Sequence, residues 1–226
     1  MRSLMPSNAS NAPLRMNKID NPHPVAESTE KSRKRISPFF ALVAFPLVAL
    51  TGLVFDLKTK DCVFDSLGMP GTYLVQTQPE LQGAYWIWPD VFGFQTSLNS
   101  GALFGMGTGR SSLFAALSFV ALAGILGWMV HSAWKSRLLS ITLAMITAGI
   151  LGNLYDRLGL HGLRWEGEPI YAVRDWILVM IGSYHWPNFN IADSLLVCGT
   201  ILIVLYTFFE EKRSLKCSTD CSSRME

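Results

Sequence analysis

Two aspartates in the second half of the chain are the residues best suited to chemistry. Asp175 lies in "VRDWI", and Asp193 follows eighteen residues later in "FNIAD". Two carboxyl groups that are brought close share one proton, because the charge of one raises the pKa of the other. The ionised carboxylate can then take a proton from water while the neutral one protonates a carbonyl oxygen. Such a pair would hydrolyse a peptide bond.

Three other short motifs, "DLKTK", "LNSG" and "GNLYDR", carry amide, glycine and charged side chains, and "FNIAD" adds an amide just before its aspartate. The residues that stand out in these motifs are Asp56, Lys60, Asn99, Gly101, Gly152, Asn153, Asp156, Arg157, Asn190 and Ala192. The four histidines lack the HExxH spacing of zinc enzymes, so neither a metal nor another cofactor is predicted.

Apolar runs must position these motifs. Half of the residues are hydrophobic and only 16% are charged. Four runs approach the ~20 apolar residues that cross a bilayer, and Asp193 is the only charged residue in any of them. These runs cover about residues 37–55, 111–130, 138–154 and 191–209. The sequence therefore predicts an all-α membrane protein with four transmembrane helices in residues 37–210.

The charges outside these runs predict the topology. Lys and Arg number seven before the first run, two in the link "HSAWKSR" and four after Phe209, whereas the long connections 56–110 and 155–190 hold more acids than bases. By the positive-inside rule both termini are cytoplasmic and the long connections face outward. Residues 1–36 are predicted to be a disordered cytoplasmic tail, and residues 211–226 a second tail. The first run is interpreted as a retained signal anchor.

On this topology all the polar motifs lie at the outer membrane face, where ionisable groups suggest a functional site. Each motif alone also has a simpler explanation. Asn190 and Asp193 fit a helix capping box, and the glycines fit close helix packing. Asp156 and Arg157 would make a surface pair, and "DLKTK" would be an interfacial anchor.

The motifs together resemble a known family. "NSGALFG", "GNLYDRL", "VRDWI" and "FNIAD", in this order, are similar to the conserved blocks of the lipoprotein signal peptidase family, signal peptidase II, and "DLKTK" resembles its first block. The resemblance covers about residues 37–210. It implies an aspartic endopeptidase of the bacterial inner membrane that cuts diacylglyceryl-modified prolipoproteins just before the lipidated cysteine, with its site on the extracytoplasmic side.

The resemblance also implies roles for single residues. Asp175 and Asp193 would be catalytic. Asn99, Gly101, Asn153, Arg157 and Asn190 would bind substrate, and Asp56, Lys60, Gly152, Asp156 and Ala192 would give structural support. Membrane lipids would be the other partners, with no nucleic acid involved and the oligomeric state left open.

This chain departs from the family pattern in three places. The link 156–175 is longer than usual, the loop 61–98 is extended, and Arg174 stands where an apolar residue is more common. The family has a small extracytoplasmic β-structure, for which 72–78 and 84–89 are candidate strands here, together with a short periplasmic helix or loop.

Two other functions remain open from the sequence. A small proton-coupled carrier would use Asp175 or Asp193 as a relay, but it needs polar groups through the whole membrane depth. A structural membrane subunit without catalysis would leave the convergence of five motifs unexplained.

Overall fold

The chain divides into two units, residues 1–34 and residues 35–226. The structure, a computed structural model, describes residues 38–70, 84–101, 109–132 and 136–222, all in the second unit. The predicted tail 1–36 and the candidate strand 72–78 lie outside the described residues.

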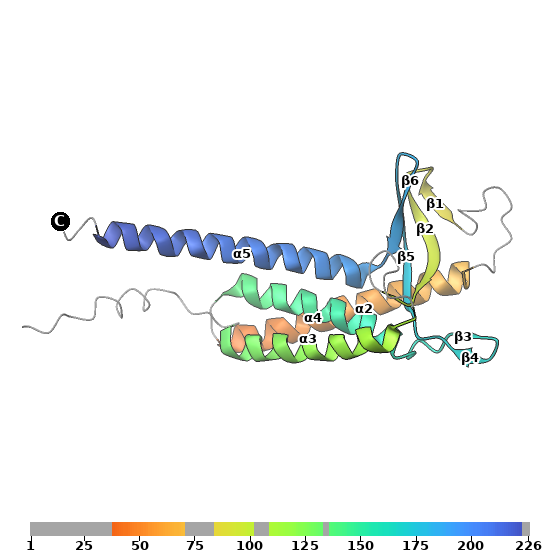
Figure 1. Ribbon diagram of the computed structural model, residues 1–226, viewed down its shortest axis with the longest axis horizontal. Helices are drawn as coiled ribbons and strands as arrows, with labels where there is room; N and C mark the ends of the chain where they lie inside the picture. The colour runs from red at the N-terminus through yellow and green to blue at the C-terminus, as the bar shows by residue number, and fades with distance from the viewer. Residues whose placement is uncertain (1–37, 71–83, 102–108, 133–135, 223–226) are drawn as a thin grey trace, which may run out of the picture. The chain divides into compact units, whose positions relative to one another are not determined.

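Four helices carry the apolar runs, and all four are long and apolar enough to cross a membrane. They are α2 (Pro38–Leu67), α3 (Ser111–Ser132), α4 (Arg137–Arg157) and α5 (Ile191–Ser222). Helix α4 packs against each of the other three (Figure 1). Of the most apolar stretch of α4, 67% is buried, whereas the corresponding stretches of the other three helices are 6% to 17% buried. Helix α4 is therefore the central helix, and the other three turn broad apolar faces outward.

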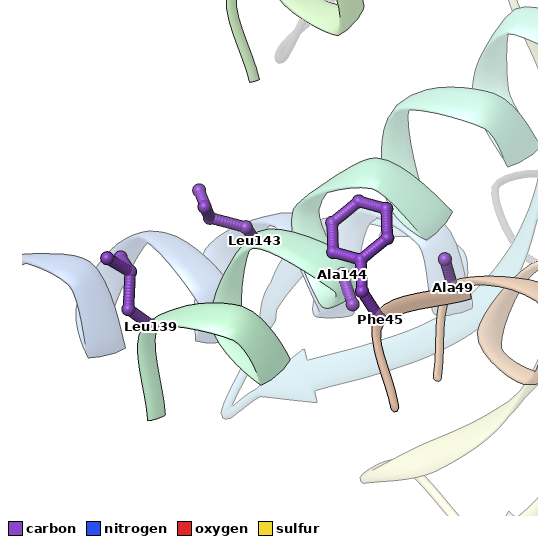
Figure 2. Close-up of a cluster of buried hydrophobic side chains, with 5 residues drawn as sticks. All are labelled: Phe45, Ala49, Leu139, Leu143 and Ala144. Atoms are coloured by element: carbon purple, nitrogen blue, oxygen red, sulfur yellow. The ribbon is translucent and has the colours of Figure 1, made fainter. Parts of the chain in front are cut away.

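The membrane-level core lies between α2 and α4. Figure 2 shows Phe45 and Ala49 of α2 beside Leu139, Leu143 and Ala144 of α4. Side chains of α3 and α5 pack around this cluster. The small alanines let the helix backbones approach closely, as is common where helices pack in lipid.

A four-stranded antiparallel sheet lies at the end of the helices where α2 stops and α5 begins (Figure 1). Its order is β1 (Tyr85–Trp88), β2 (Phe92–Asn99), β5 (Val173–Ile181) and β6 (Tyr184–Phe189). A separate hairpin joins β3 (Arg164–Trp165) to β4 (Glu168–Pro169).

The sheet packs on the last turns of α2. Val63 and Phe64 form a cluster with Trp176 and Ile177 of β5, and the Trp176 ring meets Phe94 of β2 edge to face at 5.1 Å between centroids. This apolar contact holds β2 and β5 firmly against the helix end. Their polar residues can then be placed with little freedom.

Several sequence predictions are revised here. The expected strand at 84–89 contains β1, but the strand at 92–99 was not anticipated. The sequence also led us to expect a short periplasmic helix or loop, at no stated position, and between 158 and 190 the described residues form two hairpins. Helix α2 also runs twelve residues past the expected end at Phe55. It can continue because two charged residues after Phe55, Asp56 and Lys60, pair with each other, and Lys60 also pairs with the buried Asp156.

Candidate active site

The N-terminus of α5 carries the first aspartate. The Asp193 backbone N–H donates to Asn190 Oδ1 at 2.9 Å, and the Asn190 N–H donates back to Asp193 Oδ2 at 3.2 Å. This reciprocal capping box is the simpler explanation that we considered for the pair. It also fixes the Asp193 carboxyl at the mouth of a cavity, so capping and a functional position coincide.

Strand β5 carries the second aspartate. In the β2–β5 register Asp175 lies opposite Ser97, and its side chain is 2% exposed. Asn99 at the end of β2 donates to Asp175 Oδ2 at 3.2 Å, and Asn190 donates to Oδ1 at 2.6 Å. Two amides from different elements thus hold this carboxyl group in one orientation.

Asn153 of α4 connects the aspartates to a buried charge. Its Oδ1 accepts from Lys60 Nζ and from Asn190 Nδ2, both at 3.1 Å. Since an ammonium group only donates, the amide must turn its Nδ2 the other way, where it donates to Asp193 Oδ1 at 2.7 Å. The orientation of Asn153 is therefore set by Lys60.

Lys60 belongs to a buried ion cluster behind the aspartates. Its ammonium contacts Asp56 Oδ2 at 2.7 Å and Asp156 Oδ2 at 3.1 Å, and all three side chains have no exposed surface. Arg174 binds Asp156 Oδ1 through Nε and Nη2 and reaches Asp61 Oδ1 at 2.7 Å. These contacts join α2, α4 and β5. Because Asp156 is buried in these contacts, it does not form a surface pair with Arg157. Because Lys60 is buried as well, it is not an interfacial anchor.

Glycine and alanine allow α4 to approach its neighbours at this level. A Cβ at Gly152 would lie 3.1 Å from the Ala192 Cβ and closer still to the Asp56 carboxylate. Asp56 is itself held by Lys60 and by the Ala192 N–H, which donates at 2.8 Å. The carboxylate cannot easily move aside, so Gly152 is required for this packing.

Arg157 forms the opposite side of the site. Its Nη2 donates to the Gly101 carbonyl at 3.1 Å, and its guanidinium carbon lies 5.5 Å from the centroid of the Phe114 ring. The Gly101 N–H in turn donates to Asn99 Oδ1 at 3.0 Å. The guanidinium is within electrostatic range of both Asp175 and Asp193. A permanent positive charge therefore stands beside the carboxyl pair.

The two aspartates open into one cavity of about 650 Å³. Among the residues predicted from sequence, Asn99, Asn153, Arg157, Asp175 and Asp193 line it. The other walls come from β2 and β6, which sequence reasoning did not assign to a site. Burial, followed by the nearby charge of Asp193, raises the pKa of Asp175 to about 8, although the Asn99 and Asn190 amides act in the opposite direction.

This arrangement can hold one proton on a pair of carboxyl groups at neutral pH. Asp175 retains the proton and Asp193 faces the same cavity, so an acid and a base are both presented to a ligand. Within the described ranges of the chain, no cluster of three or more His, Cys, Asp or Glu side chains is placed to hold a metal ion.

Comparison with known proteins agrees with this geometry. Residues 48–209 match the family described as signal peptidase (SPase) II. The chain belongs to the signal peptidase II family. It is therefore a multi-pass membrane hydrolase of the aspartic peptidase class, as the resemblance in the sequence indicated.

Relatives and solved structures show how far the likeness extends. The chain is 42% identical over 181 residues to the lipoprotein signal peptidase of Rhodopirellula baltica, covering 77% of this chain and 73% of that one. It is 29% identical to the lipoprotein signal peptidase of Bacillus pumilus, covering 80% and 99%. A solved bacterial membrane enzyme has the same fold, with a TM-score of 0.62 and 23% identity over 80% of this chain and 94% of the other.

All twelve site residues predicted from sequence lie at this end of the structure, either on the cavity or in the network behind it. Sequence reasoning noticed Arg174 but gave it no role, and it missed Asp61. A signal for Arg174 was present, because an arginine in the mostly apolar run "VRDWILVMI" needs a carboxylate partner when it is buried, but no such signal marked the half-exposed Asp61.

Proposed function

We propose that Asp175 and Asp193 are the catalytic dyad of this signal peptidase II, which removes signal peptides from diacylglyceryl-modified prolipoproteins. The observation that carries the proposal is a single cavity on which a buried aspartate, with its pKa raised to about 8 chiefly by burial, and a capped aspartate both open. A proton-coupled carrier is not favoured, because the family assignment and the site chemistry both indicate hydrolysis.

The surroundings of the two carboxyl groups suggest separate roles. Asp175 is buried on β5 and keeps its proton up to about pH 8. Asp193 accepts from Asn153 at 2.7 Å, and the same amide is polarised from behind by the Lys60 ammonium. Burial is what distinguishes Asp175 from Asp193, because it disfavours the charged form of a carboxyl group and so raises the pKa of Asp175. We therefore assign Asp175 as the initial acid and Asp193 as the initial base.

The reaction then follows from these roles. Asp193 takes a proton from water, the resulting hydroxide adds to the scissile carbonyl carbon, and Asp175 gives its proton to the carbonyl oxygen. The tetrahedral diol breaks down when Asp193 returns a proton to the leaving nitrogen and the C–N bond breaks. One diol hydroxyl gives its proton to Asp175, which restores the starting state of the dyad.

The remaining site residues hold the substrate and the dyad. Asn99 and Asn190 restrain Asp175, and Asn153 restrains Asp193. Arg157 places a positive charge where the carbonyl oxygen of the substrate acquires negative charge, which is a common source of transition-state stabilisation. Gly101 presents its carbonyl to Arg157 and so fixes the guanidinium.

The membrane position of the site suits a lipidated substrate. The charge distribution predicts that both termini are cytoplasmic and that the sheet lies on the extracytoplasmic side. A diacylated cysteine is anchored in the outer leaflet there, with the scissile bond near the interface. The dyad at the outer ends of the helices would meet that bond without drawing it across the membrane.

The test is cleavage of a defined substrate by the purified full chain in detergent. A prolipoprotein carrying a diacylglyceryl cysteine should yield a product that begins at the modified cysteine, as read by mass spectrometry. The same peptide without the lipid should be cut poorly. Cleavage at another bond, or none at all under conditions that preserve the fold, would contradict the proposal.

A further inference from the structure

A second hollow adjoins the catalytic cavity. It is mostly apolar, measures about 580 Å³, and lies between the first turns of α3 and the residues that follow α4. Residues from Ser111 to Phe119 form one wall, and Leu158 and Tyr171 form the other. We call it the α3 groove. Arg157 lines both the α3 groove and the catalytic cavity, so a single side chain separates them.

The α3 groove is polar at one end and apolar along the rest. Ser111 and Arg157 are at the polar end, while Ala115, Ala116 and Phe119 continue along the helix for about two turns. Phe119 is 55% exposed, so the apolar part opens outward from the bundle. A ligand that matches the groove would have a polar head near the dyad and a tail that runs along α3.

Two unsatisfied donors mark the polar end. Ser111 is 7% exposed, and its Oγ has no hydrogen-bond partner among the residues that the structure describes. Arg157 Nε is likewise buried without a partner in the described part of the chain, although its Nη2 is bound to Gly101. An unpaired buried donor is costly. These two would be satisfied by a ligand that brings acceptor oxygens to this point.

We propose that the α3 groove binds the diacylglyceryl group of the substrate, with an acyl chain along Ala116 and the ester carbonyls at Ser111 and Arg157. Ester carbonyls only accept hydrogen bonds, which is what two unpaired donors require. The lipid is attached to the residue beside the scissile bond, and the groove shares a wall with the catalytic cavity. The inference rests on the proposed function and names its lipid subsite.

The test compares two alanines of α3 that are both exposed. Ala116 lines the α3 groove, and Ala123 lies two turns further along and does not. Ala116→Phe fills the groove, and Ala123→Phe is the matched control for a large side chain facing lipid. Cleavage is measured with two substrates, one carrying palmitoyl chains and one carrying butyryl chains.

We expect Ala116→Phe to lower kcat/KM for the palmitoyl substrate by about tenfold relative to Ala123→Phe, mainly through KM. That factor corresponds to the loss of roughly two buried methylene groups. The butyryl substrate should be affected much less. Equal behaviour of the two variants, or an equal loss for both substrates, would overturn the groove assignment. Failure of the unmodified chain to cut either substrate would instead overturn the proposed function, and the inference with it.

A second variant tests the polar end without filling the groove. Ser111→Ala should weaken cleavage of a diacyl ester substrate but leave a dialkyl ether substrate unchanged, because the ether lacks the carbonyl acceptor. A similar effect on ester and ether substrates would show that Ser111 does not contact the ester. If Ala116→Phe also cleaves the ester and the ether substrate at the normal rate, the groove holds only ordinary bilayer lipid and the proposal is wrong.

Discussion

At the scale of single residues, two buried amides determine how the aspartates are held. The side-chain oxygen of Asn153 accepts from Lys60, so the Asn153 NH₂ must point at Asp193. The side-chain oxygen of Asn190 accepts from the Asp193 backbone N–H, so the Asn190 NH₂ must point at Asp175. Neither amide can flip without losing a bond to a buried partner. Uncharged side chains thus carry the influence of a distant ion cluster to the carboxyl pair.

The first prediction concerns stability against pH. The folded chain keeps a proton on Asp175 up to about pH 8, while an unfolded aspartate releases it near 3.8. The folded state therefore binds more protons between these values, and stability should fall as pH rises through this window. Thermal unfolding in one detergent should show this slope for the unmodified chain and a reduced slope for Asp175→Asn. Identical slopes would contradict a protonated Asp175.

The second prediction concerns Arg157→Gln, which removes a positive charge within range of both aspartates. Loss of a nearby cation disfavours the charged form of a carboxyl group. Both limbs of the pH–rate profile should therefore move to higher pH, and the maximal rate should fall. The profile is recorded beside a thermal-stability measurement. An unchanged profile together with lower stability would make Arg157 a packing residue.

At the scale of elements, hydropathy and charge were enough to predict the four helices, because each helix must match the bilayer on its own. The sheet was harder to predict. Strand β2 pairs with β5, about eighty residues further along, and no local pattern encodes that partner. The end of α2 was misplaced for a similar reason, since Lys60 is charged yet fully buried, and its partner Asp156 lies on a different helix, α4.

The candidate site, too, could be predicted from the sequence only where local motifs mark its residues. The motifs were enough to identify the aspartates and asparagines as candidate site residues, because "FNIAD" and "GNLYDR" place polar groups at helix ends. The buried pairing of Arg174 with Asp156 depends on β5 lying beside α4, which becomes visible only when the strands are placed. The walls contributed by β6 were missed because its exposed, mixed sequence resembles an ordinary loop.

The third prediction tests the close packing of α4. Gly152→Ala would drive a methyl group into the Asp56 carboxylate and the Ala192 Cβ, neither of which can withdraw. Overpacking of this kind typically costs about 1–3 kcal/mol, so both thermal stability and cleavage should fall. The control is Gly124→Ala on α3, where a new Cβ meets nothing within 4 Å. Equal stability of the two variants would contradict the packing role of Gly152.

At the scale of the whole molecule, the buried charged side chains of the described residues gather at one end of the helix bundle. Burying the charged side chains of Asp56, Lys60, Asp156 and Arg174 there is tolerable because these four are paired with one another, and the pairs join α2, α4 and β5. The helix faces that point away from α4 remain apolar and suit lipid contact. The fold thus separates a membrane-embedded support from a site at its rim.

The fourth prediction concerns topology. Tags on either terminus should be protected from protease added outside intact cells, because the basic segments are predicted to be cytoplasmic. Single cysteines placed at exposed positions of 61–98 or 160–170 should react with an impermeant reagent from outside, in a background without the native cysteines. An externally accessible C-terminus in a folded chain would overturn this orientation.

Replacing Asp175 and Asp193 in turn measures most directly whether they form the dyad that cuts a lipidated prolipoprotein. Asp175→Asn and Asp193→Asn should insert and fold, yet each should slow cleavage of the diacylglyceryl substrate by at least the ~10²–10⁴-fold typical of a lost acid or base. Asp65→Asn is a matched control on an exposed aspartate of α2 and should retain full activity. If either dyad variant keeps a turnover near that of the unmodified chain, that residue is not catalytic and the proposed dyad is wrong.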